Sequence, residues 1–292
     1  MNPPRDLSDY QNHLSRVTAY IHDHLSEPLD LDRLAEVANL SPYHWHRIYH
    51  ALQGETLAAT VLRLRLQRGS GYLAQSTRTV ADIARRCGYP NAQSFTRAFR
   101  QVYGKSPRAW RESASETPFE AVPPVASAAG AWPVEVREVP QITVAGLDHR
   151  GSYMRIGQAF EASRIHMAAQ NLMTADTRWL AVYLDDPFAV PEAQLHSRAG
   201  LSIEPDAAGA VAKAPLITFS LGGGPCAVLR FRGPYATMRA AYHWLYGAWL
   251  TNSGHAPADH PVFEEYLNSP RDTAPADLLT DIFLPLAGNK GQ

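Results

Sequence analysis

The sequence has little cysteine and no long apolar run. Its two cysteines, Cys87 and Cys226, lie in different halves of the 292-residue chain, which argues against a disulfide framework or a zinc cluster. The sequence contains no stretch of about 18 apolar residues, so we expect no transmembrane helix. The N-terminal residues lack the basic-then-apolar pattern of a secretory signal, so we expect a cytoplasmic chain with no membrane partner.

The chain also lacks an appreciable net charge, with a formal value of −1 at pH 7. That small value conceals an asymmetry. Residues 1–112 hold 15 Lys and Arg against 10 Asp and Glu, while the remainder holds 12 against 18. A basic first part and an acidic second part indicate a polyanionic partner for the first part only.

Residues 113–133 separate two differently patterned regions. They are rich in Ala, Ser and Pro, and they show neither helical nor alternating periodicity, which is typical of a linker. Apolar residues recur at helical spacing before this segment, and alternation begins after it. We therefore predict two domains, residues 1–112 and 134–292, each long enough to bury its own core.

Both halves contain an internal repeat. In the first half, residues 34–56 align with 83–106, so that Arg47 matches Arg97. In the second half, two pairs of segments match at offsets of 82 and 83 residues: 150–160 with 232–242, and 179–187 with 262–270. Two blocks at nearly the same offset indicate a duplicated structural unit.

The repeat in the first half predicts two helix-turn-helix units. Residues 29–40 place apolar side chains on one helical face, and Ser41-Pro42 is a typical helix start. The second unit repeats this pattern with a helix over 80–87, a turn at 88–90 and a helix over 91–102. Two such units held together could enter successive major grooves, about 34 Å apart.

The outer faces of the second helices carry side chains suited to DNA. Arginine can bond a guanine edge and glutamine an adenine edge, while other polar groups contact phosphate. The candidate DNA-contacting residues are Tyr43, His46, Arg47, His50, Asn91, Gln93, Thr96, Arg97 and Arg100. The alternative is a small helical bundle whose arginines only solvate its surface.

On these features, and on GYPNAQSFTRAFRQVYGKSPRAWR (88–111), residues 10–112 resemble the DNA-binding domain of AraC/XylS-type transcription regulators. The resemblance implies a domain of seven helices that binds promoter DNA, with RNA polymerase as a further partner. It assigns base contacts to Tyr43, His46, Arg47, Gln93 and Arg97. Trp45 and His50 depart from the family pattern, which has a small or aliphatic residue at the first position and a longer basic one at the second.

The neighbouring histidines His44, His46 and His50 could suggest a metal site, since the last two are four residues apart on one helical face. No carboxylate or cysteine completes such a site in the sequence. We therefore predict neither a metal nor a cofactor.

Each repeat of the second half predicts a strand, a helix and two further strands. The expected elements are 142–147, 153–172, 179–184 and 199–204 in the first repeat, and 226–231, 235–250, 262–267 and 279–284 in the second. The fold class is thus multidomain: an all-α double helix-turn-helix domain followed by an α+β domain of two pseudo-symmetric strand–helix–strand–strand units. Packing of the two units should close a core and leave a cleft along the seam, where small ligands usually bind.

Glu264 and Glu265 are neighbours on an expected strand and must face opposite ways. The repeat aligns Glu264 with Ala181, between Trp179 and Tyr183, so Glu264 is the acidic residue of an aromatic-lined face. A carboxylate there needs compensation. A cationic ligand held by aromatic faces could supply it; so could an internal arginine such as Arg232, or protonation.

Residues 133–287 resemble the GyrI-like effector-binding domain, on the segments LRFRGPY (229–235), YLDDP (183–187), HPVFEEYLNSP (260–270) and TDIFLPL (280–286). The resemblance implies a module that binds amphipathic, often cationic or aromatic compounds in a central cleft. It also implies that Glu264 recognises the ligand's charge. The ligand-contacting candidates carried over by position are Tyr153, Trp179, Tyr183, Tyr235, Glu264 and Tyr266.

Together these features predict a one-component transcription regulator that binds promoter DNA and senses a small amphipathic effector. It would have no catalytic residues and would not be an enzyme. Two alternatives remain for the second domain. It could hydrolyse small molecules, with Glu264 and Tyr153 or Tyr235 as reacting groups, or it could bind another protein through an exposed apolar patch. The glycines of 220–225 precede a strand, so they indicate a turn and no phosphate-binding loop.

Overall fold

The computed structural model describes residues 7–38, 48–51, 53–115, 132–187, 190–204 and 214–288. The chain divides into two compact units. Unit 1 comprises Met1–Glu116 and Pro270–Pro275, and unit 2 comprises Thr117–Ser269 and Ala276–Gln292. In the described part of the chain, every helix is too short or too polar to cross a membrane.

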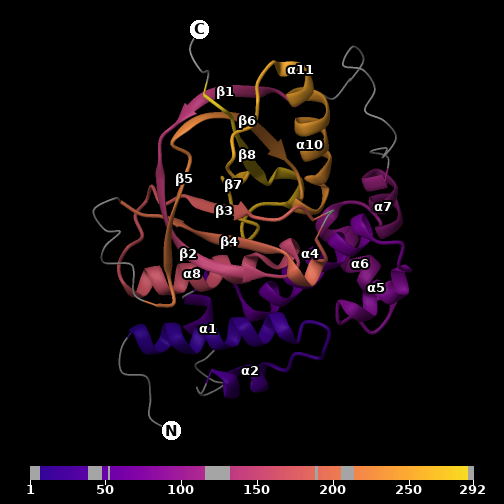
Figure 1. Cartoon of the computed structure of the whole chain (residues 1–292). Helices are drawn as coiled ribbons and strands as arrows, with labels where there is room; N and C mark the ends of the chain where they lie inside the picture. The colour runs from indigo at the N-terminus through magenta and orange to yellow at the C-terminus, as the bar shows by residue number, and fades with distance from the viewer. Residues whose placement is uncertain are drawn as a thin grey trace. The chain divides into compact units, whose positions relative to one another are not determined.

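Unit 1 is helical. Its labelled helices are α1 (Leu7–Asp23), α2 (Leu31–Val37), α4 (Leu57–Gln75), α5 (Val80–Arg86), α6 (Ala92–Tyr103) and α7 (Pro107–Ser115) (Figure 1). Residues 48–51 and 53 are helical as well. Thr56, Thr79 and Asn91 cap α4, α5 and α6, because each side chain accepts a hydrogen bond from the backbone N–H three residues on, at 3.1, 3.2 and 2.8 Å. The predicted helices over 80–87 and 91–102 are confirmed to within one residue at each end.

Close packing around α4 holds the second helix-turn-helix unit together. The rings of Phe95 and Phe99 on α6 are fully buried, and Phe95 lies directly over Gly69 of α4. A Cβ atom at Gly69 would meet the Phe95 ring at 2.7 Å, so a larger residue there would displace α6. The position of α6 against α4 thus depends on the lack of a side chain at Gly69.

The turn between α5 and α6 depends on Gly88. Its φ is +72°, and a Cβ atom there would lie 2.5 Å from the carbonyl oxygen of Leu25. Arg65 secures the same region, because its Nε donates to the Leu25 carbonyl at 3.0 Å and its Nη2 to the Glu27 carbonyl at 2.7 Å. A left-handed backbone in a crowded place leaves glycine as the suitable residue.

Unit 2 is built on one antiparallel sheet with the strand order β1-β6-β8-β7-β3-β4-β2-β5. The strands are β1 (Val134–Val139), β2 (Ile142–Arg150), β3 (Trp179–Tyr183), β4 (His196–Ser202), β5 (Ile217–Leu221), β6 (Gly224–Arg232), β7 (Phe263–Tyr266) and β8 (Leu279–Pro285). Figure 1 shows that the sheet is strongly curled. The predicted fold class is therefore confirmed.

The sheet is symmetric about its central pair, β3 and β7. Pairings in the first repeat, β2 with β4 and β3 with β4, recur as β6 with β8 and β7 with β8. Each repeat also begins with a strand that the repeat alignment did not predict, β1 or β5. These two are exchanged: β1 pairs with β6 of the second repeat, and β5 pairs with β2 of the first. The exchange interlocks the two repeats, so neither is complete alone.

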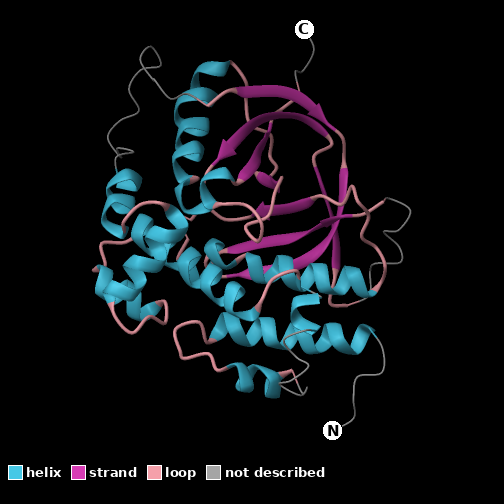
Figure 2. Cartoon of the chain, turned by 180° about the vertical axis from the view of Figure 1, so that it is seen from behind, coloured by secondary structure: helices cyan, strands magenta, loops and turns pink. Residues whose placement is uncertain are grey.

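Helices cover one face of this sheet (Figure 2). In the first repeat a 3-10 turn, Tyr153–Arg155, precedes α8 (Gly157–Ala169), which packs on β2 and β4. In the second repeat a turn at Tyr235–Thr237 precedes α10 (Arg239–Trp244), which continues as a π-helical segment and ends in the short α11 (Thr251–Ser253). The single helices predicted over 153–172 and 235–250 are therefore interrupted, since each first turn is 3-10.

The opposite face of the sheet closes on itself. Buried residues from strands at both ends and at the centre of the sheet form one apolar cluster: Val139, Ile142, Val144, Leu180, Val182, Leu221, Cys226, Val228, Phe263 and Phe283. Strands that are distant in the sheet order can share a core only if the sheet curls. The curl buries this face without a second layer of helices.

Candidate functional site

Glu264 lies at the centre of unit 2, on the helix-covered face of β7. Its register partner across the central strand pair is Ala181 of β3, and only 4% of the residue is exposed. Glu265 faces the other way, as alternation predicts, and Arg178 donates to it through Nε and Nη2 at 2.7 and 2.6 Å. The two adjacent carboxylates therefore have separate environments and separate partners.

Tyrosine hydroxyls surround the Glu264 carboxylate. Tyr242 on α10 donates to Oε1 at 2.7 Å. Oε2 accepts from Tyr266 at 2.6 Å and lies 3.1 Å from the Tyr183 hydroxyl. Tyr183 and Tyr266 are also 2.6 Å apart through their hydroxyls, and either can be the donor. Among the described residues, the partners of the carboxylate are thus neutral phenols and not a basic group.

The protonation states follow from burial. Desolvation raises the pKa of Glu264 above its ordinary value, and the phenol hydrogen bonds oppose that rise. Burial, together with the nearby Glu264 charge, raises the pKa of Tyr183, Tyr242 and Tyr266 well above 10. The phenols therefore remain protonated donors at neutral pH, and the carboxyl is the group of this cluster that titrates most readily.

The aromatic rings around Glu264 obey the repeat symmetry. Tyr153 packs edge-on against Tyr183 with ring centroids 4.7 Å apart, and its equivalent Tyr235 packs edge-on against Tyr266 at 5.4 Å. All four rings are partly exposed, whereas the carboxylate beneath them is buried. The structure thus brings together four of the predicted tyrosines and Glu264.

Trp179 belongs to the same face but lies farther from the carboxylate along the sheet. It packs with Phe160 of α8 at a centroid distance of 5.8 Å, and Phe160 in turn packs edge-on against Tyr266 at 5.1 Å. Phe160 is the repeat equivalent of Tyr242. Sequence reasoning missed Tyr242, and the signal was available: at this position the two repeats differ by one hydroxyl.

Tyr153 is anchored by the loop after β3. Its hydroxyl lies 2.8 Å from the carbonyl of Asp185 and 3.0 Å from that of His196, and it accepts from the Asp185 N–H at 3.2 Å. Burial is the main cause of the raised pKa of this phenol. Tyr153 is therefore held in place as a neutral group beside the site.

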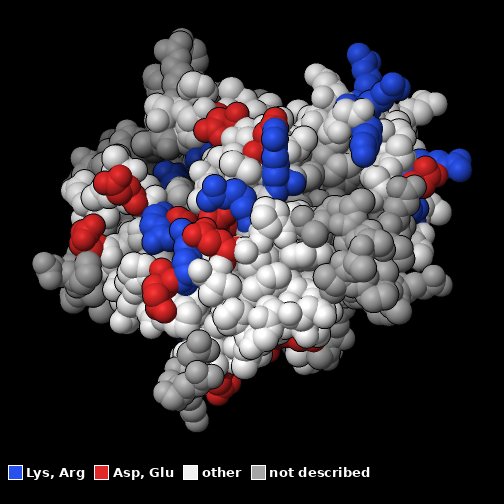
Figure 3. Space-filling model, turned by 90° about the horizontal axis from the view of Figure 1, so that it is seen from above, with Lys and Arg blue, Asp and Glu red and all other residues white. Residues whose placement is uncertain are grey.

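Several arginines of unit 2 pair with carboxylates other than Glu264. Arg232, which was considered as an internal partner of Glu264, instead donates to Asp277. Arg230 binds both oxygens of Asp281 at 2.8 Å. On the face drawn in Figure 3, the basic and acidic side chains of the described residues lie interspersed. The hypothesis that Arg232 compensates the buried Glu264 carboxylate was therefore wrong. The hydrogen-bond partners of this carboxylate are the phenols of Tyr183, Tyr242 and Tyr266.

The exposed face of α6 carries the polar residues expected there. Phe95 and Phe99 point into the core, while Gln93, Arg97 and Arg100 are exposed. A surface groove is lined by Ala92, Gln93, Thr96, Arg97, Arg100 and Gln101. Asn91 has a structural role, because its side chain caps the helix by accepting from Ser94.

The first helix-turn-helix unit is described only in part. His50 is exposed, and the neighbouring Tyr49 is buried with its hydroxyl 2.9 Å from that of Thr60. Tyr43, His46 and Arg47 lie outside the described residues, as does His44. Within the described ranges, no group of three His, Cys, Asp or Glu side chains is placed to hold a metal ion.

Two arginines of α5, and Arg78 just before it, differ from the arginines of α6. Arg86, Arg78 and Arg85 all donate to Asp82, at 2.9, 3.2 and 2.5 Å. These hydrogen bonds, that of Arg86 foremost, lower the pKa of Asp82 to about 2. For Arg97 and Arg100, by contrast, no ion pair joins the guanidinium to another residue that the structure describes. The α6 guanidiniums can therefore bind an external acceptor without first breaking such a pair.

Comparisons with known proteins match each half separately. Residues 133–287 match the model of the GyrI-like small molecule binding domain, and residues 34–113 match a helix-turn-helix domain. Over 96 residues the chain is 33% identical to the bifunctional transcriptional activator/DNA repair enzyme AdaA of Bacillus subtilis, which covers 33% of this chain and 46% of that protein. It is 30% identical over 106 residues to the transcriptional regulator Rob of Salmonella typhimurium, covering 36% and 37%.

A solved structure matches the same region: the DNA-binding domain of AdpA, described as a global transcriptional factor in complex with a target DNA. The identity is 29%, the TM-score is 0.33, and the match covers 34% of this chain and 90% of that one. The matched region is less than half the length of either curated relative. The GyrI-like match, in contrast, covers more than half of this chain. The chain therefore belongs to the GyrI-like family of small-molecule-binding domains, and it carries an AraC-type helix-turn-helix domain ahead of that domain.

Proposed function

We propose that this protein is a one-component transcription regulator: its helix-turn-helix domain binds promoter DNA, and its GyrI-like domain senses an amphipathic, cationic aromatic compound. The observation that carries the proposal is the buried Glu264 carboxylate beneath partly exposed tyrosines. RNA polymerase as a protein partner stays a prediction from the family resemblance. Activity as an enzyme is the alternative that the experiments below separate from sensing.

The DNA-binding part of the proposal is supported by α6. Gln93 and Arg97 are exposed one helical turn apart, and both side-chain types form paired hydrogen bonds to purine edges in the major groove. Thr96 and Arg100 lie on the same lined surface and suit phosphate contacts. The AdpA DNA-binding domain, which matches this region, is described in complex with a target DNA.

The sensing part is supported by the chemistry around Glu264. A cation that reaches the carboxylate exchanges neutral phenol partners for a full positive charge, while the flanking tyrosine rings offer faces for cation–π contact. A neutral aromatic compound gains the ring contacts without the charge pairing. We therefore expect the site to prefer a cation over a neutral compound of the same shape.

The test is a binding titration of the full chain in which tryptophan fluorescence reports the bound ligand. Tetraphenylphosphonium is the cationic probe, and triphenylphosphine oxide is the neutral comparison. We expect saturable binding of the cation and a loss of about tenfold in affinity, or ~1.4 kcal/mol, in Glu264→Gln. The matched control is Glu265→Gln, which alters the adjacent carboxylate on the opposite face and should leave binding within about twofold.

Equal affinity of wild type and Glu264→Gln for the cation would contradict charge recognition at this site. Turnover of a small ester probe by the wild type, lost in Glu264→Gln, would support the enzymatic alternative. Binding of neither probe together with retained DNA binding would favour a protein-binding module. DNA binding is tested independently with Arg97→Ala, which should cost about 1–3 kcal/mol and relax the base preference at one position of the site.

A further inference from the structure

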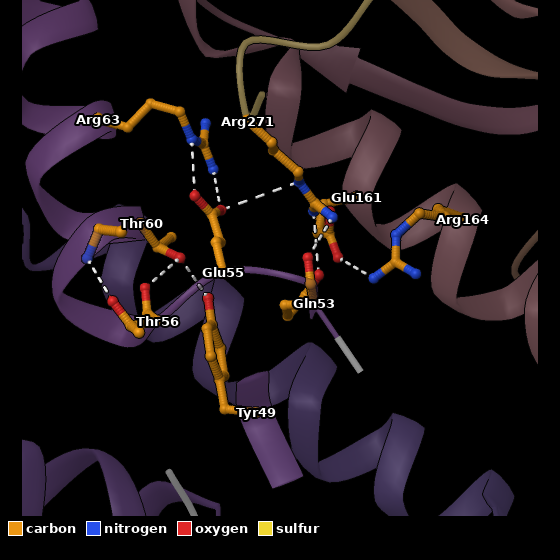
Figure 4. Close-up of polar contacts among 10 residues, drawn as sticks. Tyr49, Gln53, Glu55, Thr56, Thr60, Arg63, Glu161, Arg164 and Arg271 are labelled. Atoms are coloured by element: carbon orange, nitrogen blue, oxygen red, sulfur yellow. Dashed lines mark hydrogen bonds and ion pairs between the residues drawn. The ribbon is translucent and has the colours of Figure 1, made fainter. Parts of the chain in front are cut away.

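The segment Pro270–Pro275 has an unusual place in the chain. It connects β7 with β8, and the residues on both sides of it belong to unit 2, but its own contacts place it in unit 1. Arg271 makes the polar contacts of this segment with the first helix-turn-helix unit. Figure 4 shows the Arg271 guanidinium directed at Gln53 and Glu55.

Arg271 binds the C-terminal end of the helix that contains His50. Its Nη1 donates to the Gln53 carbonyl at 3.0 Å, and its Nη2 donates to the Gln53 side-chain Oε1, also at 3.0 Å. The helix ends here, because Gly54 has a φ of +74° and its N–H donates to the His50 carbonyl at 2.9 Å. The last carbonyls of a helix lack intrahelical partners, and the helix dipole favours a cation at this end.

Glu55 joins the same cluster through its carboxylate. Arg63 donates to both of its oxygens, through Nε at 3.2 Å and Nη2 at 2.5 Å, and Arg271 Nε lies 3.8 Å from Oε1. The Glu55 side chain is only 9% exposed. Two guanidiniums thus share one largely desolvated carboxylate, which gives Arg271 a fixed position instead of a solvated one.

On the unit 2 side, the segment continues directly from the candidate effector site. Tyr266, a donor to Glu264, is the last residue of β7. The chain after it is braced: Leu267 N–H donates to the Leu279 carbonyl at 3.0 Å, and Asn268 Oδ1 accepts from the Leu279 N–H at 2.8 Å. Leu267 and Asn268 are therefore fixed to the start of β8, and Ser269 and Pro270 are the two residues between Asn268 and Arg271.

We propose that Arg271 is a positioning residue for DNA recognition: it fixes the C-terminal end of the helix that contains His50 and makes that position depend on occupancy at Glu264. The second part of this proposal rests on the proposed function, whereas the first does not. A ligand that draws Glu264 away from Tyr266 would favour one position of Arg271 over another. The ligand can change the DNA affinity only to the extent that it binds one of those two states more tightly than the other.

The first experiment measures base discrimination without any ligand. Full-length protein is used to select a duplex from a randomised library, and the affinity of each variant is measured for single-base changes along that duplex. Arg97→Ala identifies the half contacted by α6. We expect Arg271→Gln to lose about fivefold or more discrimination in the other half and to keep it in the α6 half. A merely structural loss would weaken both halves alike.

Two further variants keep this test decisive. Arg271→Lys retains the charge but not the two-pronged donation to Gln53, so it should rescue discrimination only partly and serves if Arg271→Gln fails to fold. Arg232→Gln removes another guanidinium, one paired with Asp277 on the surface, and should behave as wild type. An unchanged discrimination profile in both Arg271 variants would overturn the positioning role.

The second experiment adds tetraphenylphosphonium. If it binds the wild type, we expect it to change DNA affinity by about 5- to 150-fold, and we expect Arg271→Gln to reduce that change to within about twofold while the fluorescence titration stays the same. A ligand-induced change that persists in Arg271→Gln would overturn the coupling. If the cation does not bind the wild type, the proposed effector class fails, and the discrimination profile still decides the role of Arg271.

Discussion

The two repeats of unit 2 share a backbone but differ in chemistry at matching positions. Ala181 in the first corresponds to Glu264 in the second, Phe160 to Tyr242, and Asp185 to Asn268. The symmetric features are those that build the sheet, and the unsymmetric ones gather where β3 meets β7. Ala181 and Glu264 are register partners across that junction, so a glutamate in both repeats would bring two carboxylates together. The symmetry of the fold itself therefore favours a single acidic residue there.

The largest expected effect comes from restoring the symmetry with Ala181→Glu. The new carboxylate would face Glu264 in a buried position, where neither charge has a basic partner among the described residues. We expect a loss of about 3–5 kcal/mol in the free energy of unfolding at pH 7. Urea-induced unfolding followed by tryptophan fluorescence measures it.

Ala181→Gln is the matched control, because it adds nearly the same volume without charge. The difference between the Glu and Gln variants isolates the repulsion, and it should shrink at pH 4, where carboxyls become protonated. If both variants lose the same stability at pH 7, the damage is due to overpacking, and the electrostatic explanation for the asymmetry is wrong.

A smaller effect is expected from Tyr242→Phe, which gives the second repeat the ring of the first. It removes the hydroxyl that donates to Glu264 Oε1 at 2.7 Å. Loss of a hydrogen bond to a buried charged group should cost about 1.5–3 kcal/mol at neutral pH. Thermal and urea unfolding measure the cost, with Tyr246→Phe as the control, since Tyr246 is 41% exposed. Equal costs for the two variants would contradict the assigned role of Tyr242.

The pH dependence of stability should report the burial of the Glu264 carboxyl. Burial raises the pKa of Glu264 above 4.5, so the folded state holds this proton more tightly than the unfolded state. The resulting stabilisation is fully present below the ordinary value and is lost as pH rises toward the raised pKa, by at most about 1.4 kcal/mol per pH unit. The difference between wild type and Glu264→Gln should show this decline. A flat difference for Glu264→Gln would contradict the raised pKa.

The smallest effect is expected at Asn268, which corresponds to Asp185 of the first repeat. Asn268 accepts from the Leu279 N–H at 2.8 Å and donates to the Asp277 carbonyl at 3.0 Å, while Asp185 accepts from the equivalent His196 N–H at 2.6 Å. Asn268→Asp keeps the acceptor and loses the donor, which should cost about 0.5–1.5 kcal/mol. Asn268→Ala loses both and should cost more in the same unfolding assay. The reverse order would show that the added charge outweighs the retained hydrogen bond.

Periodicity and self-similarity allowed much of this arrangement to be predicted. Alternation placed Glu264 and Glu265 on opposite faces, and the alignment with Ala181 selected the aromatic face for Glu264. The repeat alignment also matched Tyr153 with Tyr235 and Tyr183 with Tyr266, and the family resemblance assigned these four tyrosines to the ligand site. These inferences succeed because side-chain direction on a strand follows from local geometry alone.

The partners of these side chains were less accessible to such reasoning. Arg232 was a plausible neighbour of Glu264, but it reaches Asp277. Tyr242 lay within the helix predicted over 235–250 and was not singled out, although its hydroxyl donates to the carboxylate. Arg271, within the connection from β7 to β8, gave no local sign that it would bind Gln53. Each of these contacts joins residues that are distant in sequence or on different elements.

By itself, the sequence determined the two-part organisation, the duplicated units and the facing of residues along each strand, because these depend on composition, spacing and local backbone geometry. Only the tertiary structure decided that β1 and β5 exchange between the repeats. It also decided that the described partners of Glu264 are phenols and not an arginine, and that Arg271 belongs to unit 1. Such choices depend on which of several compatible groups lies within hydrogen-bonding distance of a buried polar atom, and that is set by the packing of the whole chain.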